Sequence, residues 1–219
     1  NLISNSVTIG NGVISGVFSV SGTVTVNSLL IVRTKTLNMN GGGTFHSNVG
    51  ITEGGTIVNA MGQTLNSVSL NGTVISSTFI GGPGTFTNNG NFIRNSPGNS
   101  VVANAITFNN NGSMDVAAGT LDINAASTLN NTGTIKGNGT LIITGPFNNN
   151  GTFAPGASAG QLGITRTSLT NNLLEIELSS NAGPGTGHDR LNVTGSFVAD
   201  GTLTVLLIGG YMPTIGTTY

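Results

Sequence analysis

The sequence contains very few charged residues. Only 13 of its 219 residues are Lys, Arg, Asp or Glu, which is 6% of the chain, whereas an ordinary soluble domain has about 25%. The six basic residues are scattered, so they form no basic stripe that could neutralise nucleic-acid phosphates. We therefore expect no nucleic-acid partner. Asparagine and threonine, about 30 of each, predict a neutral, hydrogen-bonding exterior.

Cysteine is absent, which excludes disulfide bonds, thiolate metal sites and a cysteine nucleophile. Long hydrophobic runs are missing too. The longest runs of large aliphatic residues, 29–32 and 205–208, have the length of a strand and fall far short of the roughly 18 apolar residues of a transmembrane helix. We expect no membrane span in this segment.

The two ends of the sequence carry no terminal signals. Residues 1–5 have neither the basic start nor the apolar block of a signal peptide. Residues 216–219 are strand-forming and end without a closing turn. Either a signal peptide has been removed or this is an internal fragment, and the C-terminal residues favour a fragment of a larger protein.

The main feature of the sequence is a set of internal repeats. Four segments, 86–92, 108–114, 129–135 and 147–153, share the pattern apolar-x-Asn-x-Gly-(Asn, Ser or Thr)-apolar, and their glycines are 22, 21 and 18 residues apart. Glycine and asparagine accommodate tight corners, and alternating apolar residues between corners indicate strands with one buried face. A looser form, apolar-x3-Gly-Thr-apolar, occurs at 18–24, 39–45, 51–57, 68–74 and 197–203.

This repeat predicts an all-β fold, a single right-handed parallel β-helix (β-solenoid) with about 18–22 residues per coil. Parallel stacking places like residues on like at about 4.8 Å. We expect an asparagine ladder at one corner, formed by Asn88, Asn110, Asn131 and Asn149. Two apolar columns should stack inside: Phe86, Phe108, Leu129 and Phe147, and Phe92, Met114, Ile135 and Phe153. Charged residues would repel in such columns, whereas Asn, Ser and Thr can hydrogen-bond along them.

The composition and the repeat pattern of the sequence change near residue 154. We expect residues 1–153 to form the regular Asn/Gly/Thr-rich coils. Residues 154–219 should continue the same solenoid with longer strands and two glycine loops, 154–160 and 183–187.

The last 71 residues, 149–219, carry a longer pattern: PG-x-S-x-G-x-L-x-I, then L-x-I-E, a glycine loop, D-x-L-x-V-x-G, G-x-L-x-V and Gly-Tyr-x-Pro. This segment resembles repeats of very large bacterial surface and autotransporter-like proteins. The resemblance implies a parallel β-helix on an exported, cell-surface or extracellular protein, and it implies no catalytic residues. The matching positions are Pro155, Gly156, Ser158, Gly160, Leu162, Ile164, Leu174, Ile176, Glu177, Asp189, Leu191, Val193, Gly195, Gly201, Leu203, Val205, Tyr211, Pro213 and Gly216.

Parallel β-helices also include polysaccharide-degrading enzymes, so the acidic residues are candidates for a catalytic pair. We expect Asp115 and Asp122 to lie on separate strands and face solvent. Glu175 and Glu177 share one face of one strand, where they could attract a cation, but no third acid is near them in sequence.

Two further groups of residues resemble sites. The cluster His188-Asp189-Arg190 follows a glycine loop. It should anchor that loop, with Asp189 accepting backbone N–H bonds and Arg190 packing along the rim; the alternative is a calcium or ligand contact. His46 is expected on the surface, and neither histidine has a partner at metal-ligand spacing.

The glycine clusters 41–43 and 81–84 lack the following Lys-Ser/Thr of a phosphate loop, so we expect corners there.

The sequence therefore predicts no catalytic, cofactor-binding or metal-binding residues and no cofactor. The leading hypothesis is a structural or adhesive segment of a secreted bacterial surface or filament protein. Its expected partners are neighbouring copies stacked end to end, glycans or a host surface. Two alternatives stay open, a β-solenoid that binds ice or a polysaccharide surface through Thr-x-Thr rows, and a β-helix polysaccharide-degrading enzyme.

Overall fold

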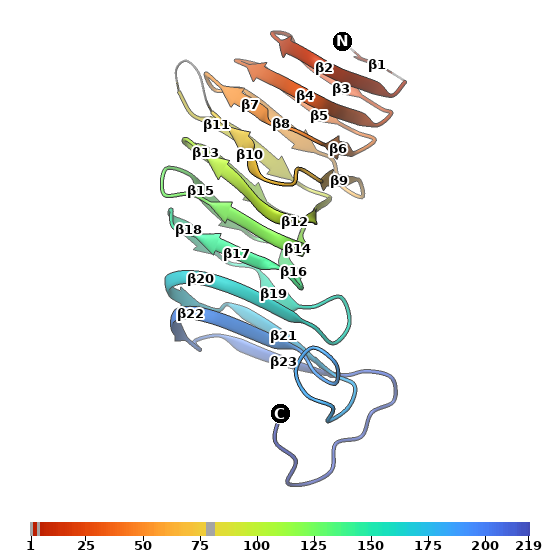
Figure 1. Ribbon diagram of the computed structural model, residues 1–219, viewed down its shortest axis with the longest axis vertical. Coiled ribbons are helices and arrows are strands. Elements are labelled where there is room, and N and C mark those ends of the chain that lie inside the picture. Colours follow the sequence, from red (N-terminus) through yellow and green to blue (C-terminus); the bar gives the residue numbers. More distant parts are fainter. Residues whose placement is uncertain (1, 4, 78–81) are drawn as a thin grey trace.

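The computed structural model describes residues 2–3, 5–77 and 82–219 and shows a right-handed parallel β-helix (Figure 1). Its coils stack from the N-terminal strands at the top of Figure 1 to the C-terminal strands at the bottom. All the strand pairs that join the coils are parallel, and the described residues contain no helix. The predicted fold class is confirmed.

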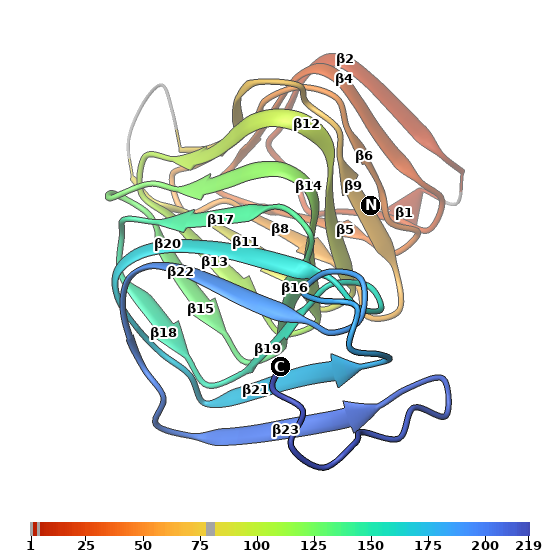
Figure 2. The ribbon, with the colours of Figure 1, turned by 60° about the horizontal axis from the view of Figure 1, so that its bottom comes forward.

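Each regular coil contributes strands to three faces, which surround the core in Figure 2. Face 1 is an eight-stranded sheet. Its strands are β1 (Leu2–Ile3), β3 (Phe18–Val20), β5 (Thr36–Met39), β8 (Thr56–Asn59), β11 (Gly84–Asn88), β13 (Ile106–Asn110), β15 (Thr128–Asn131) and β18 (Phe147–Asn149).

Faces 2 and 3 form one fifteen-stranded sheet that bends at a corner. Four strands turn this corner and contribute to both faces: β2 (Val7–Ile14), β4 (Val24–Arg33), β12 (Asn91–Ala103) and β14 (Ser113–Ile123). Face 2 also has β6 (Gly43–Phe45), β9 (Thr64–Ser67), β16 (Thr134–Gly137), β19 (Thr152–Pro155), β21 (Leu173–Leu178) and β23 (Thr202–Leu207). Face 3 also has β7 (Val49–Thr52), β10 (Gly72–Ser76), β17 (Thr140–Ile143), β20 (Gln161–Thr170) and β22 (Arg190–Val198).

The core consists of apolar columns, one residue per coil, as predicted. Phe86 pairs with Phe108, Phe108 with Leu129, and Leu129 with Phe147. The second predicted column also lies in register, from Phe92 to Phe153. Both columns belong to one continuous hydrophobic cluster. Burial of these side chains contributes about 25 cal/mol per Å² of apolar surface, so the stacking is the main source of stability.

The asparagine ladder runs along the corner between faces 1 and 2. Asn88 donates to Asn110 and Asn110 to Asn131, each at 2.8 Å, and Asn131 donates to Asn149 at 2.7 Å. The ladder starts one coil earlier than predicted, because Asn59 donates to Asn88 at 2.8 Å. Its amide nitrogens also bond backbone carbonyls of the next strand. The amides between the two ends of the ladder are therefore satisfied, as buried polar groups require, whereas the terminal atoms Asn59 Oδ1 and Asn149 Nδ2 have no hydrogen-bond partner among the described residues.

Coil length is regular in the middle and longer in two places. Successive ladder asparagines are 22, 21 and 18 residues apart from Asn88 onward, which matches the prediction. Asn59 and Asn88 are 29 residues apart, and Gly160 and Asp189, which also bond between coils, are again 29 apart. Because strand pairing keeps its register, loops at the corners absorb the extra residues. Residue 81 of the predicted glycine corner 81–84 lies outside the described residues.

The looser repeats do not occupy one corner. Segments 18–24, 39–45 and 197–203 lead into face 2, as the four main repeats do, whereas 51–57 leads from face 3 into face 1 and 68–74 from face 2 into face 3. Gly-Thr starts strands on all three faces, so its recurrence marks corners in general. The strand order β16-β19-β21-β23 crosses residue 154 without interruption; the division of the chain at that residue stays a prediction.

One arginine lies inside the solenoid, which the sequence did not predict. The side chain of Arg94 is fully buried, and burial lowers its pKa. Its Nη2 donates to Gly98 O at 3.2 Å, across the bulge of β12, while Nε and Nη1 have no hydrogen-bond partner among the described residues. The guanidinium thus holds this corner at a desolvation cost.

Candidate functional site

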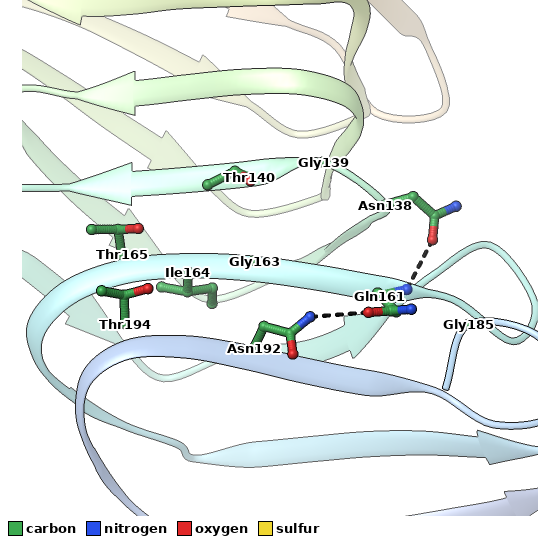
Figure 3. Close-up of a pocket in the computed structure, with 10 residues that line it drawn as sticks. All are labelled: Asn138, Gly139, Thr140, Gln161, Gly163, Ile164, Thr165, Gly185, Asn192 and Thr194. Carbon is green, nitrogen blue, oxygen red and sulfur yellow. Dashed lines mark hydrogen bonds between the residues drawn. The ribbon is translucent and has the colours of Figure 1, made fainter. Parts of the chain in front are cut away.

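A hollow with a volume of about 690 Å³ lies on face 3, across β17, β20 and β22 (Figure 3). Its volume lies in the range of small-molecule binding sites, about 300–1,000 Å³. Figure 3 labels the ten lining residues, which are Asn, Gln, Thr, Gly and one Ile. None of them is ionisable or aromatic.

The hollow results from the position of one glycine in an outward-facing column. Gly163 of β20 pairs with Thr140 of β17 above it and with Asn192 of β22 below it. The column therefore lacks a side chain in its middle, and the backbone of Gly163 forms the floor. A Cβ at residue 163 would lie 3.0 Å from Thr140 Oγ1. A side chain at residue 163 that extends beyond Cβ would fill the hollow.

Gln161 connects the parts of the hollow at the start of β20. Its backbone N–H donates to Asn138 Oδ1 at 3.0 Å, and its Oε1 accepts from Asn192 Nδ2 at 3.3 Å (Figure 3). Its Nε2 donates to Pro184 O at 3.1 Å, which ties the glycine loop 183–187 to the edge of the hollow. These bonds orient three polar side chains from three coils.

Asp189 anchors the loop before it, as predicted. Its Oδ1 accepts from Gly160 N at 2.7 Å and its Oδ2 from Glu177 N at 2.8 Å. Burial raises the pKa of Asp189, and these two backbone bonds act in the opposite direction. The carboxylate thereby joins both glycine loops to β21. The neighbouring Arg190 is exposed.

The structure adds a third acid to the pair Glu175 and Glu177. Asp189, although distant in sequence, lines the same small cavity of about 230 Å³, together with Lys136. Burial, followed by the charges of Asp189 and Glu175, raises the pKa of Glu177. Both oxygens of Asp189 already accept backbone bonds. Among the described residues, no group of three or more His, Cys, Asp and Glu side chains could hold a metal ion.

The other sequence candidates do not assemble into a site. Asp115 and Asp122 were expected on separate strands, but both lie on β14, which turns the corner between them and places them on faces 2 and 3. They form no catalytic pair. His46 is exposed after the end of β6. The ring of His188 packs edge-on against Tyr219 at 5.7 Å.

Four carboxyl groups that are buried or partly buried predict an unusual pH dependence. Burial raises the pKa of Asp115, Asp122, Glu177 and Asp189. An acid whose pKa is higher in the folded state binds protons more tightly there, so its contribution to stability is complete below the unfolded pKa, near 4, and is lost as the pH rises through the folded value. We expect a melting temperature at pH 4 equal to or above that at pH 7, measured by circular dichroism. A decrease of more than about 5 °C at pH 4 would contradict this. As a control, Asp115→Asn should reduce the pH dependence.

The polar residues of the hollow were missed by sequence analysis. Asn138, Gln161 and Asn192 come from loops and strand starts with no shared motif, and their separations of 23 and 31 residues differ from the repeat period. The available signal was Gly163, a glycine inside an otherwise alternating strand, which often marks a close approach or an open surface.

Comparisons with known proteins add no relative. No family model, curated protein or solved structure matches this chain. In the described part of the chain, no helix is long and apolar enough to cross a membrane.

Proposed function

We propose that this chain is a structural and adhesive segment of a secreted bacterial surface or extracellular filament protein, similar to the autotransporter-like repeats that residues 149–219 resemble. The observation that carries the proposal is the continuous solenoid itself. Stacked columns form a long body with a nearly neutral composition, and among the described residues no group of three or more His, Cys, Asp and Glu side chains could hold a metal ion. Such a body presents loops and side chains at fixed spacing along its axis.

The test of this function uses antibodies and coated beads. Antibodies against the chain should label intact, unpermeabilised cells of the source organism, and beads coated with the purified chain should bind those cells or their hosts. Labelling that appears only after lysis would contradict the extracellular proposal. Polysaccharide cleavage by the purified chain that is abolished by Glu177→Gln would contradict the non-enzymatic role.

The open strand edges favour association with neighbouring copies. Among the described strands, β23 pairs with β21 alone and leaves Leu203, Val205 and Leu207 exposed. An exposed apolar edge strand is a template for another strand. We propose end-to-end stacking of copies, which predicts a mass that increases with concentration in sedimentation experiments. A strictly monomeric chain at millimolar concentration would remove this part of the proposal.

A column of threonines on face 1 favours a second function, binding to ice. Five threonines, one from each successive strand, stack in register: Thr36, Thr56, Thr85, Thr107 and Thr128. The predicted Thr-x-Thr pairs do not form this array, and only Thr85 and Thr87 share a strand of face 1. The five threonines are unevenly spaced along the sequence, but strand pairing places them at one regular distance in the structure. A neutral, regular column of hydroxyls and methyls at about 4.8 Å suits an ordered lattice.

Thermal hysteresis measures this second function directly. The purified chain should depress the freezing point below the melting point, and Thr107→Lys on face 1 should abolish the effect. Thr134→Lys, at an outward position of β16 on face 2, is the matched control and should leave it intact. Absence of hysteresis in the unmodified chain would exclude ice binding.

A further inference from the structure

The hollow on face 3 has more hydrogen-bonding capacity than the protein uses. The hydroxyls of Thr140, Thr165 and Thr194 have no side-chain hydrogen bond among the described residues, and neither do Asn138 Nδ2 and Asn192 Oδ1. Figure 3 shows Thr140, Thr165 and Thr194 on the three successive strands β17, β20 and β22, with Asn192 also on β22 and Asn138 in the loop before β17. The hollow therefore offers both donors and acceptors to a bound molecule.

The charges around the hollow restrict the chemistry of that molecule. No lining residue is ionisable. Two charged residues adjoin the lining set without belonging to it: Arg190, which pairs with Gln161, and Arg166, which follows Thr165 and donates to the backbone carbonyls of Ile143 and Gly145. A charged ligand would lose hydration without gaining an ion pair inside the hollow. Hydroxyl groups, which both donate and accept, match threonine and amide side chains without a net charge.

The shape of the hollow further restricts which molecule can bind there. The three threonine hydroxyls lie on three strands that succeed one another at about 4.8 Å along the solenoid axis. A ligand that uses all of them must lie across the strands and repeat its polar groups at a similar distance. A chain of pyranose rings has this property, because each ring advances by about one strand spacing and carries several hydroxyls. A peptide would need its own backbone paired, and no strand edge borders the floor, since β20 pairs on both sides.

We propose that this hollow binds two or three consecutive sugar residues of a neutral polysaccharide, lying along the axis over Gly163. This inference rests on the adhesive function proposed above and gives it a ligand class and a site. Asn138, Gln161 and Asn192 orient the chain at one side, and Thr140, Thr165 and Thr194 contact its hydroxyls. Gly163 is the residue that leaves room for the ring.

The lining also sets the strength of binding. Among the described lining residues, none is aromatic, so no ring stacks on the sugar. A site of this kind binds with a dissociation constant on the order of 1 mM, about −4 kcal/mol. Several sites presented together would give a much higher avidity. Polymers and bead-bound protein should therefore show binding that single sugars do not.

The experiment is affinity electrophoresis of the purified chain in gels containing one polysaccharide each. The probes are β-1,3-glucan, soluble β-1,4-glucan, α-mannan and galactan, with alginate as the charged comparison. We expect retardation by at least one neutral polymer and none by alginate. Gly163→Leu should weaken the retardation at least fivefold, whereas Thr134→Leu on face 2, an outward position outside the hollow, should not.

Several outcomes would overturn the inference. These are no retardation by any of the four neutral polymers, preference for alginate, and retardation that survives Gly163→Leu. If Gly163→Leu lowers the melting temperature by more than a few degrees, the double variant Thr165→Ala with Thr194→Ala replaces it and should give the same loss. Coated beads that bind cells while no neutral polymer retards the chain would overturn this site but leave the adhesive function. Failure of the beads and of surface labelling would overturn the function itself.

Discussion

Replacing Asn110 by Asp is expected to destabilise the solenoid by about 3–5 kcal/mol, because a buried hydrogen-bonded pair loses one partner and a charge is left in its place. Asn110 Nδ2 donates to Asn131 Oδ1 at 2.8 Å and to Thr134 O at 3.1 Å. A carboxylate donates neither bond, and its oxygen would face the oxygen of Asn131. For a chain of this size the change corresponds to a decrease in melting temperature of about 6–20 °C.

The matched control for this change is Asn109→Asp, one residue earlier on β13. The side chain of Asn109 faces outward, where its Oδ1 accepts from Asn130 Nδ2 at 2.8 Å. A carboxylate still accepts this bond, and it remains hydrated, so we expect a loss below about 1 kcal/mol. The pH dependence gives a second check. In the Asn110→Asp variant, protonation of the introduced carboxylate restores one donor, so the loss of stability should shrink as the pH falls. Equal effects of the two substitutions would contradict the ladder's role.

The asparagine ladder shows how much a repeat reveals and where it fails. Asn88, Asn110, Asn131 and Asn149 were predictable because their coils keep one seven-residue pattern. Asn59 makes the same bond, yet it precedes a coil that is 29 residues long and lacks the glycine two positions later. A sequence pattern detects a constant spacing, whereas the fold keeps only the strand register constant.

The candidate site was harder to predict than the fold for the same reason. The hollow requires Gly163 to lie between Thr140 and Asn192, which depends on the lengths of two coils with different loops. Asp189 joins Glu177 only because the glycine loop folds back on β21. Nothing in the sequence marks Arg94 as buried, because the carbonyl that it bonds, that of Gly98, is supplied by the bulge of β12 inside the corner. The local sequence pattern predicts that like residues stack in columns. It does not predict which residues come into contact between coils of unequal length.

The corner glycines give the second large effect. Gly90, Gly112, Gly133 and Gly151 were expected to permit a tight bend, and the structure gives a more specific reason. None of them has a positive φ; each lies so close to the preceding coil that a side chain has no room. A Cβ at residue 133 would lie 1.9 Å from Gly112 O, and one at residue 112 would lie 2.1 Å from Gly90 O. Backbone atoms held on both sides by parallel pairing cannot move away.

Gly133→Ala should therefore cost about 3 kcal/mol or more, at the upper end of the effects of overpacking, because the added methyl must separate two coils. Thermal or urea unfolding followed by circular dichroism measures the loss. Gly10→Ala is the matched control, since no atom lies within 4 Å of a Cβ there and its φ is not positive; we expect it to be neutral or slightly stabilising, as the unfolded chain loses freedom. If both substitutions prove equally mild, the coils can separate at this corner, and close stacking is not the reason that glycine occupies it.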